Sequence, residues 1–123
     1  MEVIAVAVVE MHDSILVTIK KMLGYDEDYN AFDTDIIIFI NSAMMAASQF
    51  GVGPPEGYRI TGDTETWSDY LGENELLLEA IKSYIYFSVK LAHDPPSNSF
   101  VVTSFERQMK EAEWRLNVRA EEA

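Results

Sequence analysis

The chain contains no cysteine. Disulfide bonds and thiolate zinc sites are therefore excluded, and nothing in the composition places the protein in an oxidising compartment. The only histidines, His12 and His93, stand far apart in the sequence and offer zinc no obvious set of ligands. The sequence predicts neither a metal nor a cofactor, and an intracellular protein fits it best.

Basic residues are also scarce, with 9 Lys and Arg against 21 Asp and Glu and a net charge of −12. This balance opposes sequence-independent binding of nucleic acid, because such binding requires basic side chains to displace counterions. A protein that surrounds DNA without binding it is still compatible with this net charge. Residues 97–123 carry four bases and five acids, net −1, whereas residues 1–96 carry five bases and sixteen acids, net −11. The C-terminal part is therefore best suited to approach an acidic partner.

No hydrophobic run is long enough to span a bilayer. The apolar run between Glu2 and Glu10 is short, and it lacks the positive flank of a secretory signal. Its valines favour a short strand or an extended arm. We expect residues 1–10 to be an N-terminal extension or arm, and residues 11–123 to form a single helical domain, since 48% hydrophobic content suffices for one core.

Apolar periodicity predicts a mainly α fold, a small bundle of about four helices. The second helix carries apolar residues on several sides, which predicts burial on more than one side. The third has its polar residues on one narrow face and is expected to be the central element. The predicted helices cover residues 14–23 (capped by Asp13), 33–50, 75–93 and 97–120 (capped by Ser97 or Ser99).

The stretch between the second and third helices, residues 51–73, is rich in glycine and proline. It predicts a long loop or a short β-hairpin, with strands at 58–60 and 64–66 around Thr61-Gly62-Asp63. A connection of this length in a compact domain usually has a function.

The last helix has two apolar faces, because residues advance 100° per position. One face carries Val101, Phe105, Met109, Ala112 and Leu116 and is expected to meet the core. The other lies opposite and is a predicted subunit or partner interface, since Trp and Arg are enriched at interface hot spots. The alternative is that Trp114 lies flat on the surface or under the N-terminal arm. The predicted interface residues are Phe100, Arg107, Trp114, Arg115 and Val118.

Three patterns that resemble chemical sites have simpler interpretations. His93-Asp94 precedes Pro95-Pro96, and helix-stop rules account for every residue of that stretch without a catalytic pair. The acidic turn 25–35 matches an EF-hand only in part, because glycine and the bidentate glutamate are missing at positions six and twelve. "GVGPP" lacks the lysine and the following helix of a phosphate-binding loop. No catalytic residue is predicted.

Five blocks carry a family resemblance: "MHDSILVTIKKMLG", "FDTDIIIFINSAMMAASQFGVGP", "TWSDYLG", "AIKSYIYFSVKLAHDPP" and "FERQMKEAEWRLN". In order and spacing, over residues 11–123, they resemble the small head-tail connector proteins of long-tailed bacteriophages and prophages, also called adaptor or head-completion proteins. The extension "MEVIAVAVVE" departs from that pattern.

The resemblance implies a non-enzymatic virion protein of the neck region, assembled in the host cytoplasm. It implies a homo-oligomeric ring, twelvefold, that binds the portal protein, extends the DNA channel without specific DNA binding, and presents a surface to a stopper or tail-completion protein. The C-terminal helix would contact the portal or neighbouring subunits. The long loop would face the channel or the next ring through Tyr58, Arg59, Asp63, Glu65 and Trp67.

Two other functions compete with the connector. A small acidic phage regulatory protein that mimics DNA would bind a basic host target, and the net charge of −12 is compatible with it. A small hydrolase using His93 would lose activity, but not assembly, on His93→Ala. Ring formation separates the first alternative from the connector.

Overall fold

The computed structural model describes residues 10–122. Within that range the chain is helical and has no strand, which confirms the predicted mainly α fold. Of the N-terminal arm predicted for residues 1–10, all but Glu10 lies outside the described residues. The elements are α2 (Ile15–Met22), α3 (Asp33–Ser48), α4 (Trp67–Leu71), the 3₁₀ turn η1 (Glu75–Leu77), α5 (Leu78–His93) and α6 (Ser99–Glu122).

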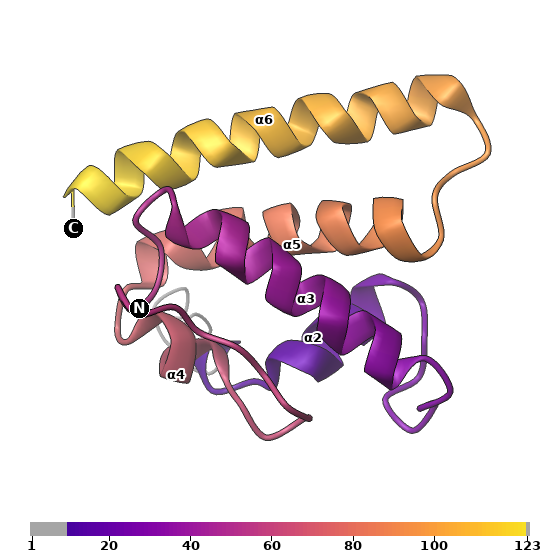
Figure 1. The fold of residues 1–123 in the computed structure, drawn as a ribbon, viewed down its shortest axis with the longest axis horizontal. Helices are drawn as coiled ribbons and strands as arrows, with labels where there is room; N and C mark the ends of the chain where they lie inside the picture. The colour runs from indigo at the N-terminus through magenta and orange to yellow at the C-terminus, as the bar shows by residue number, and fades with distance from the viewer. Residues whose placement is uncertain (1–9, 123) are drawn as a thin grey trace.

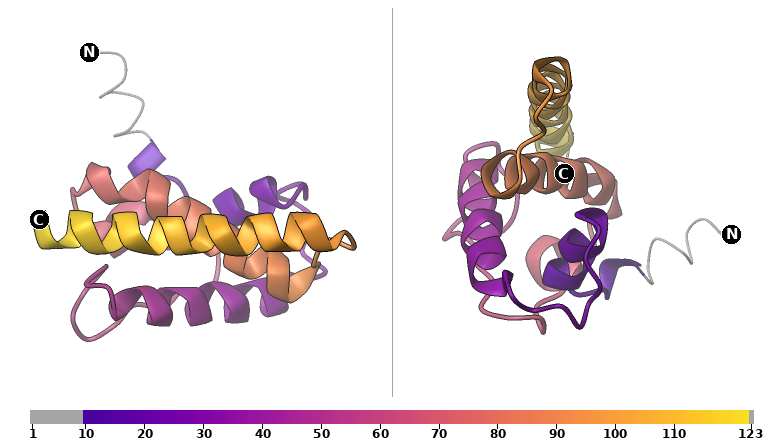
Figure 2. Two further views of the ribbon diagram at one scale, coloured as in Figure 1. Left: turned by 90° about the horizontal axis from the view of Figure 1, so that it is seen from above. Right: turned by 90° about the vertical axis from the view of Figure 1, so that its right-hand side faces the viewer.

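Helix α5 is the central element, as its apolar pattern predicts. It packs against α6 on one side and against α3 and α2 on the others (Figures 1 and 2). Its Ile81, Ile85 and Val89 are completely buried. Helix α6 runs antiparallel to α5 as the outermost element (Figure 1). One long side of α6 therefore has no neighbouring helix in the described chain.

The caps of two helices differ from the prediction. Helix α2 is capped by Ser14, not Asp13, because Ser14 has the extended backbone and its Oγ accepts a hydrogen bond from the Val17 N–H at 3.2 Å. Helix α6 begins at Ser99, and the Oδ1 of Asn98 accepts from the Phe100 N–H at 2.8 Å, in place of a cap by Ser97 or Ser99. An asparagine caps as well as a serine does, so local sequence did not decide between them.

Helix α3 is packed over much of its circumference and open on one side. Its neighbours α5 and α2 cover a fully buried stripe, Ile36, Ile40, Ala43, Met44 and Ala47. On the flanks of this stripe Ile37, Phe39 and Ala46 are partly buried against the core, in agreement with the predicted burial on more than one side. On the opposite side Ile38 is 55% exposed and Met45 is 71% exposed. Apolar content alone does not reveal which stripe of a helix finds a neighbour.

The connection between α3 and α5 is a loop that contains a short helix, and the predicted strands at 58–60 and 64–66 do not form. Side-chain hydrogen bonds replace a hairpin ladder: the Asn41 amide holds the Ile60 N–H at 2.8 Å and the Ile60 carbonyl at 3.0 Å. Helix α4 follows, with a capping box made by Thr66 and Asp69. The loop is thus fastened to α3 near its middle, at Ile60, and ends in α4.

Trp67, the first residue of α4, is part of the core. Its side chain is fully buried, and its indole N–H donates to Thr18 Oγ1 on α2 at 3.1 Å. The backbone reinforces this contact, since the Ile15 N–H donates to the Glu65 carbonyl and the Trp67 N–H to the Asp13 carbonyl. α4 therefore serves as a clamp that ties the long loop to α2.

The turn at Thr61-Gly62 depends on the Glu65 carboxylate. It accepts hydrogen bonds from the Thr61 N–H at 2.7 Å, the Thr61 hydroxyl at 2.9 Å and the Gly62 N–H at 3.3 Å. Burial alone would raise the pKa of Glu65, but these hydrogen bonds outweigh it and hold the pKa below its ordinary value of 4.5.

We therefore expect Glu65→Gln to destabilise the protein at neutral pH. A folded-state pKa below the unfolded value stabilises the fold above the unfolded pKa, and this contribution is lost as pH falls through the folded pKa. The difference from the unmodified protein, measured by urea unfolding, should shrink below about pH 4. Asp63→Asn, on the same turn, is the control and should change stability little at either pH. Equal stability losses for Glu65→Gln at pH 7 and pH 3 would contradict the prediction.

Candidate partner interface on the C-terminal helix

The inner face of α6 meets the core as predicted, most completely in its C-terminal half. Leu116 is fully buried and Ala112 is 6% exposed. Nearer the start of the helix, the Phe105 ring packs against Phe87 of α5, with ring centroids 4.9 Å apart. Val101, one turn before Phe105, is 38% exposed. The packing fixes which side of α6 points away from the protein.

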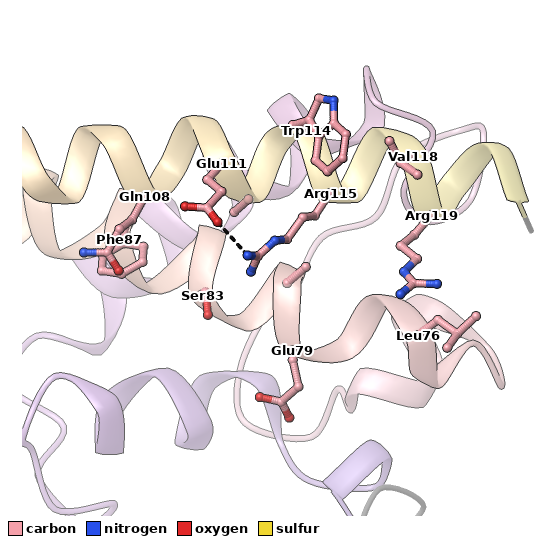
Figure 3. Close-up of a pocket in the computed structure, with 12 residues that line it drawn as sticks. Leu76, Glu79, Ser83, Phe87, Gln108, Glu111, Trp114, Arg115, Val118 and Arg119 are labelled. Carbon is pink, nitrogen blue, oxygen red and sulfur yellow. Dashed lines mark hydrogen bonds and ion pairs between the residues drawn. The ribbon is translucent and has the colours of Figure 1, made fainter.

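The outward face of α6 carries four of the five residues predicted as an interface, and the fifth, Arg115, points toward α5 (Figure 3). Phe100 is 84% exposed and Trp114 is 66% exposed, which are large fractions for aromatic side chains. Arg107 and Arg115 are also exposed, and Val118 is half-buried. The described residues therefore leave this face open, and the alternative that the N-terminal arm covers Trp114 concerns residues outside them.

A groove of about 630 Å³ runs between α6 and the start of α5 (Figure 3). Arg115 points from α6 into it and forms an ion pair with Glu111, while Trp114 stands on the other side of the helix axis (Figure 3). The groove is lined by Leu76, Glu79, Ala80, Ser83, Phe87, Gln108, Glu111, Ala112, Trp114, Arg115, Val118 and Arg119. The outward face and the groove are continuous, because Trp114 and Val118 belong to both.

Two bases without an ion pair lie near Trp114, on a helix that also carries five acids. Arg107 and Lys110 precede it by two turns and one turn, on the outward side of α6. Neither makes an ion pair within residues 10–122, whereas Lys20, Lys82 and other bases are paired with acids of the same chain. An aromatic side chain flanked by unpaired bases is a surface suited to an acidic, partly apolar partner.

His93 has a structural role in the fold. α5 ends at His93, as the helix-stop interpretation predicts, with Asp94 as the C-terminal cap. The imidazole Nε2 lies 3.0 Å from the Tyr25 hydroxyl, and the ring packs edge-on against Phe32 at 5.0 Å between centroids. Asp94 instead pairs with Lys90 at 2.8 Å, and this hydrogen bond and charge lower the pKa of Asp94. The carboxylate that would orient a catalytic imidazole is therefore engaged elsewhere.

The acidic turn is organised around a lysine that sequence reasoning did not identify. Lys20 is only 2% exposed, and its Nζ lies 3.0 Å from Asp33 Oδ1 and donates to the Glu27 carbonyl at 2.9 Å. Its burial could have been predicted from its position four residues after Leu16, which places it on the apolar stripe of α2. Among residues 10–122 no group of three or more His, Asp or Glu could hold a metal ion.

The predicted loop residues are separated by the structure. Arg59 and Asp63 are exposed, and Tyr58 is half-buried with its ring stacked on Tyr70 at 5.3 Å. The Glu65 carboxylate is already hydrogen-bonded to the backbone of the turn at Thr61-Gly62. Trp67 cannot reach a channel or another ring, because its side chain is fully buried, and we remove it from the loop set.

These features are typical of a small helical protein that acts through contacts with other proteins, since its outermost helix keeps two large aromatic side chains in solvent. Comparison with protein families identifies which kind of protein-binding helical protein this is. Residues 15–123 match the family of phage connector proteins, and the chain belongs to that family. The match spans α2 to α6 and confirms the resemblance carried by the five sequence blocks.

Family membership makes the chain a structural connector component of a phage particle. No curated protein and no solved structure matches it significantly. None of the helices formed by residues 10–122 is both long and apolar enough to cross a membrane.

Proposed function

We propose that the protein is a non-enzymatic head-tail connector that assembles into a twelvefold ring between the portal and the tail or stopper protein of a phage. In this position it extends the DNA channel and completes the head after packaging. The observation that carries the proposal is the exposed outward face of α6, with Phe100 84% and Trp114 66% exposed on the outermost helix. In a ring, each subunit can bury against its neighbours and the portal the apolar surface that a monomer would expose to solvent.

The charge of the chain supports a channel through which DNA slides. A net charge of −12 repels phosphates, whereas a clamp on DNA would need basic residues to release counterions. The tip of the long loop is the segment we assign to the channel or the next ring. Asp63 lies there, exposed, on a turn that Glu65 holds in shape.

The proposal is tested by counting subunits. Native mass spectrometry and negative-stain microscopy of the purified protein, alone and mixed with its portal protein, should show closed rings or a ring bound to the portal. A protein that stays monomeric in both experiments and has no affinity for the portal would overturn the connector function. Tight binding to a basic host protein by such a monomer would instead favour the DNA-mimic alternative.

A further inference from the structure

The outer side of α3 is a second exposed apolar surface, separate from α6. Ile38 and Met45 are 55% and 71% exposed, and they stand seven residues apart, two helical turns, so they point in nearly the same direction. With Ser42 between them they form one wall of a groove of about 460 Å³. The loop residues Glu56, Gly57, Tyr58 and Arg59 form the other wall.

The loop wall of this groove is held in place. The Asn41 side chain on α3 makes two hydrogen bonds to the Ile60 backbone, and Tyr58 stacks on the buried ring of Tyr70. The groove is thus present before any partner arrives, which lowers the ordering cost of binding.

Side chains of opposite charge that make no ion pair lie beside the two exposed faces. Helix α3 contains two acids and no base, and Asp35 lies one turn before Ile38. Asp35 and Glu56 make no ion pair within the described chain, and neither do Arg107 and Lys110 beside Trp114 on α6. Arg59 also lines the groove, so the α3 side carries two acids against one base without ion pairs, and Arg107 and Lys110 of α6 are the bases that could pair with those acids.

We propose that the outer groove of α3 in one copy receives the outward face of α6 from a neighbouring copy. Trp114 enters the groove against Ile38 and Met45, and Arg107 and Lys110 lie against Asp35 and Glu56. This inference rests on the proposed ring and names the two surfaces that build it.

The arrangement of the helices fits such a contact between copies. α3 and α6 lie on different sides of α5 (Figure 2, right). A contact between two different surfaces is head-to-tail, and its repetition closes a ring when the rotation fits.

The test uses two variants that each disable one face. Met45→Glu retains only a working α6 face, and Trp114→Glu retains only a working α3 groove. Each variant alone should fail to form rings in native mass spectrometry. Mixed in equal amounts, they should form a 1:1 dimer and stop there, because the dimer has one good contact and no second pair of intact surfaces.

Met22→Glu on α2 is the matched control, since Met22 is a partly exposed apolar residue outside both faces, and it should assemble like the unmodified protein. If circular dichroism shows that a test variant is unfolded, Ile38→Glu replaces Met45→Glu and Arg107→Glu replaces Trp114→Glu. Rings formed by folded Met45→Glu, or a mixture that stays monomeric, would overturn this inference. The proposed function fails separately, if the unmodified protein forms no ring alone or on the portal.

Discussion

Trp67→Ala is expected to cost about 3–5 kcal/mol of the free energy of unfolding, the usual range for removing a large buried aromatic side chain. Its indole is fully buried between α4 and α2, and its N–H donates to Thr18 Oγ1 at 3.1 Å. Since small domains have only about 5–15 kcal/mol of stability, the variant should be marginally folded. Urea unfolding followed by far-ultraviolet circular dichroism measures the loss.

Trp114→Ala provides the matched control for this change when urea unfolding is measured at concentrations where the proteins are monomeric, because the same side chain is removed from an exposed position. Trp114 is 66% exposed, and surface substitutions usually alter stability by no more than about 0.5 kcal/mol. The stability loss of Trp67→Phe should lie between those of Trp67→Ala and Trp114→Ala, since the phenyl ring stays buried but Thr18 loses its hydrogen bond. A urea midpoint for Trp67→Ala equal to that of Trp114→Ala would show that α4 is not a clamp on the core.

The largest effect on assembly is expected for Trp114→Ala. Truncating an interface hot spot costs about 2 kcal/mol or more, which is roughly a 30-fold or larger loss of affinity at each subunit contact. Because every subunit of a ring makes this contact, rings should dissociate at concentrations where the unmodified protein is fully assembled. Native mass spectrometry or sedimentation velocity over a concentration series measures the shift.

Two controls separate the effect on assembly from an effect on folding. The far-ultraviolet circular dichroism of Trp114→Ala should match that of the unmodified protein, because the side chain lies opposite the buried Ala112 and Leu116. Met22→Ala, a partly exposed apolar truncation on α2, should leave the assembly curve unchanged. Loss of helical signal in Trp114→Ala would mean that the residue supports the core and that the interface assignment is wrong.

Local sequence signals predicted most helix boundaries. The third and fourth predicted helices, 75–93 and 97–120, correspond to η1 with α5 and to α6, because proline and helix-stop residues separate them. The outward face of α6 was also predictable. A helix of 24 residues with two apolar stripes has one more than a single neighbour can cover.

The features that were missed depend on residues far away in the sequence. The loop 51–66 forms no hairpin because Asn41, on another element, satisfies the Ile60 backbone. Trp67 was assigned to the loop surface because nothing local indicates that α2 receives it. Lys20 was not identified because its partner Asp33 follows an intervening turn.

By itself, the sequence determined that this is a small, mainly helical, acidic protein whose last helix has more apolar surface than its own core needs, because periodicity and charge are local properties of the chain. The tertiary structure was needed to show which side of α3 stays exposed. Helix α5 covers one stripe each of α3 and α6, and so leaves Ile38 and Met45 in solvent, as well as Trp114 on the face that was predicted. Which stripe of a helix with several apolar sides is buried depends on the positions of its neighbours, which a local pattern does not specify.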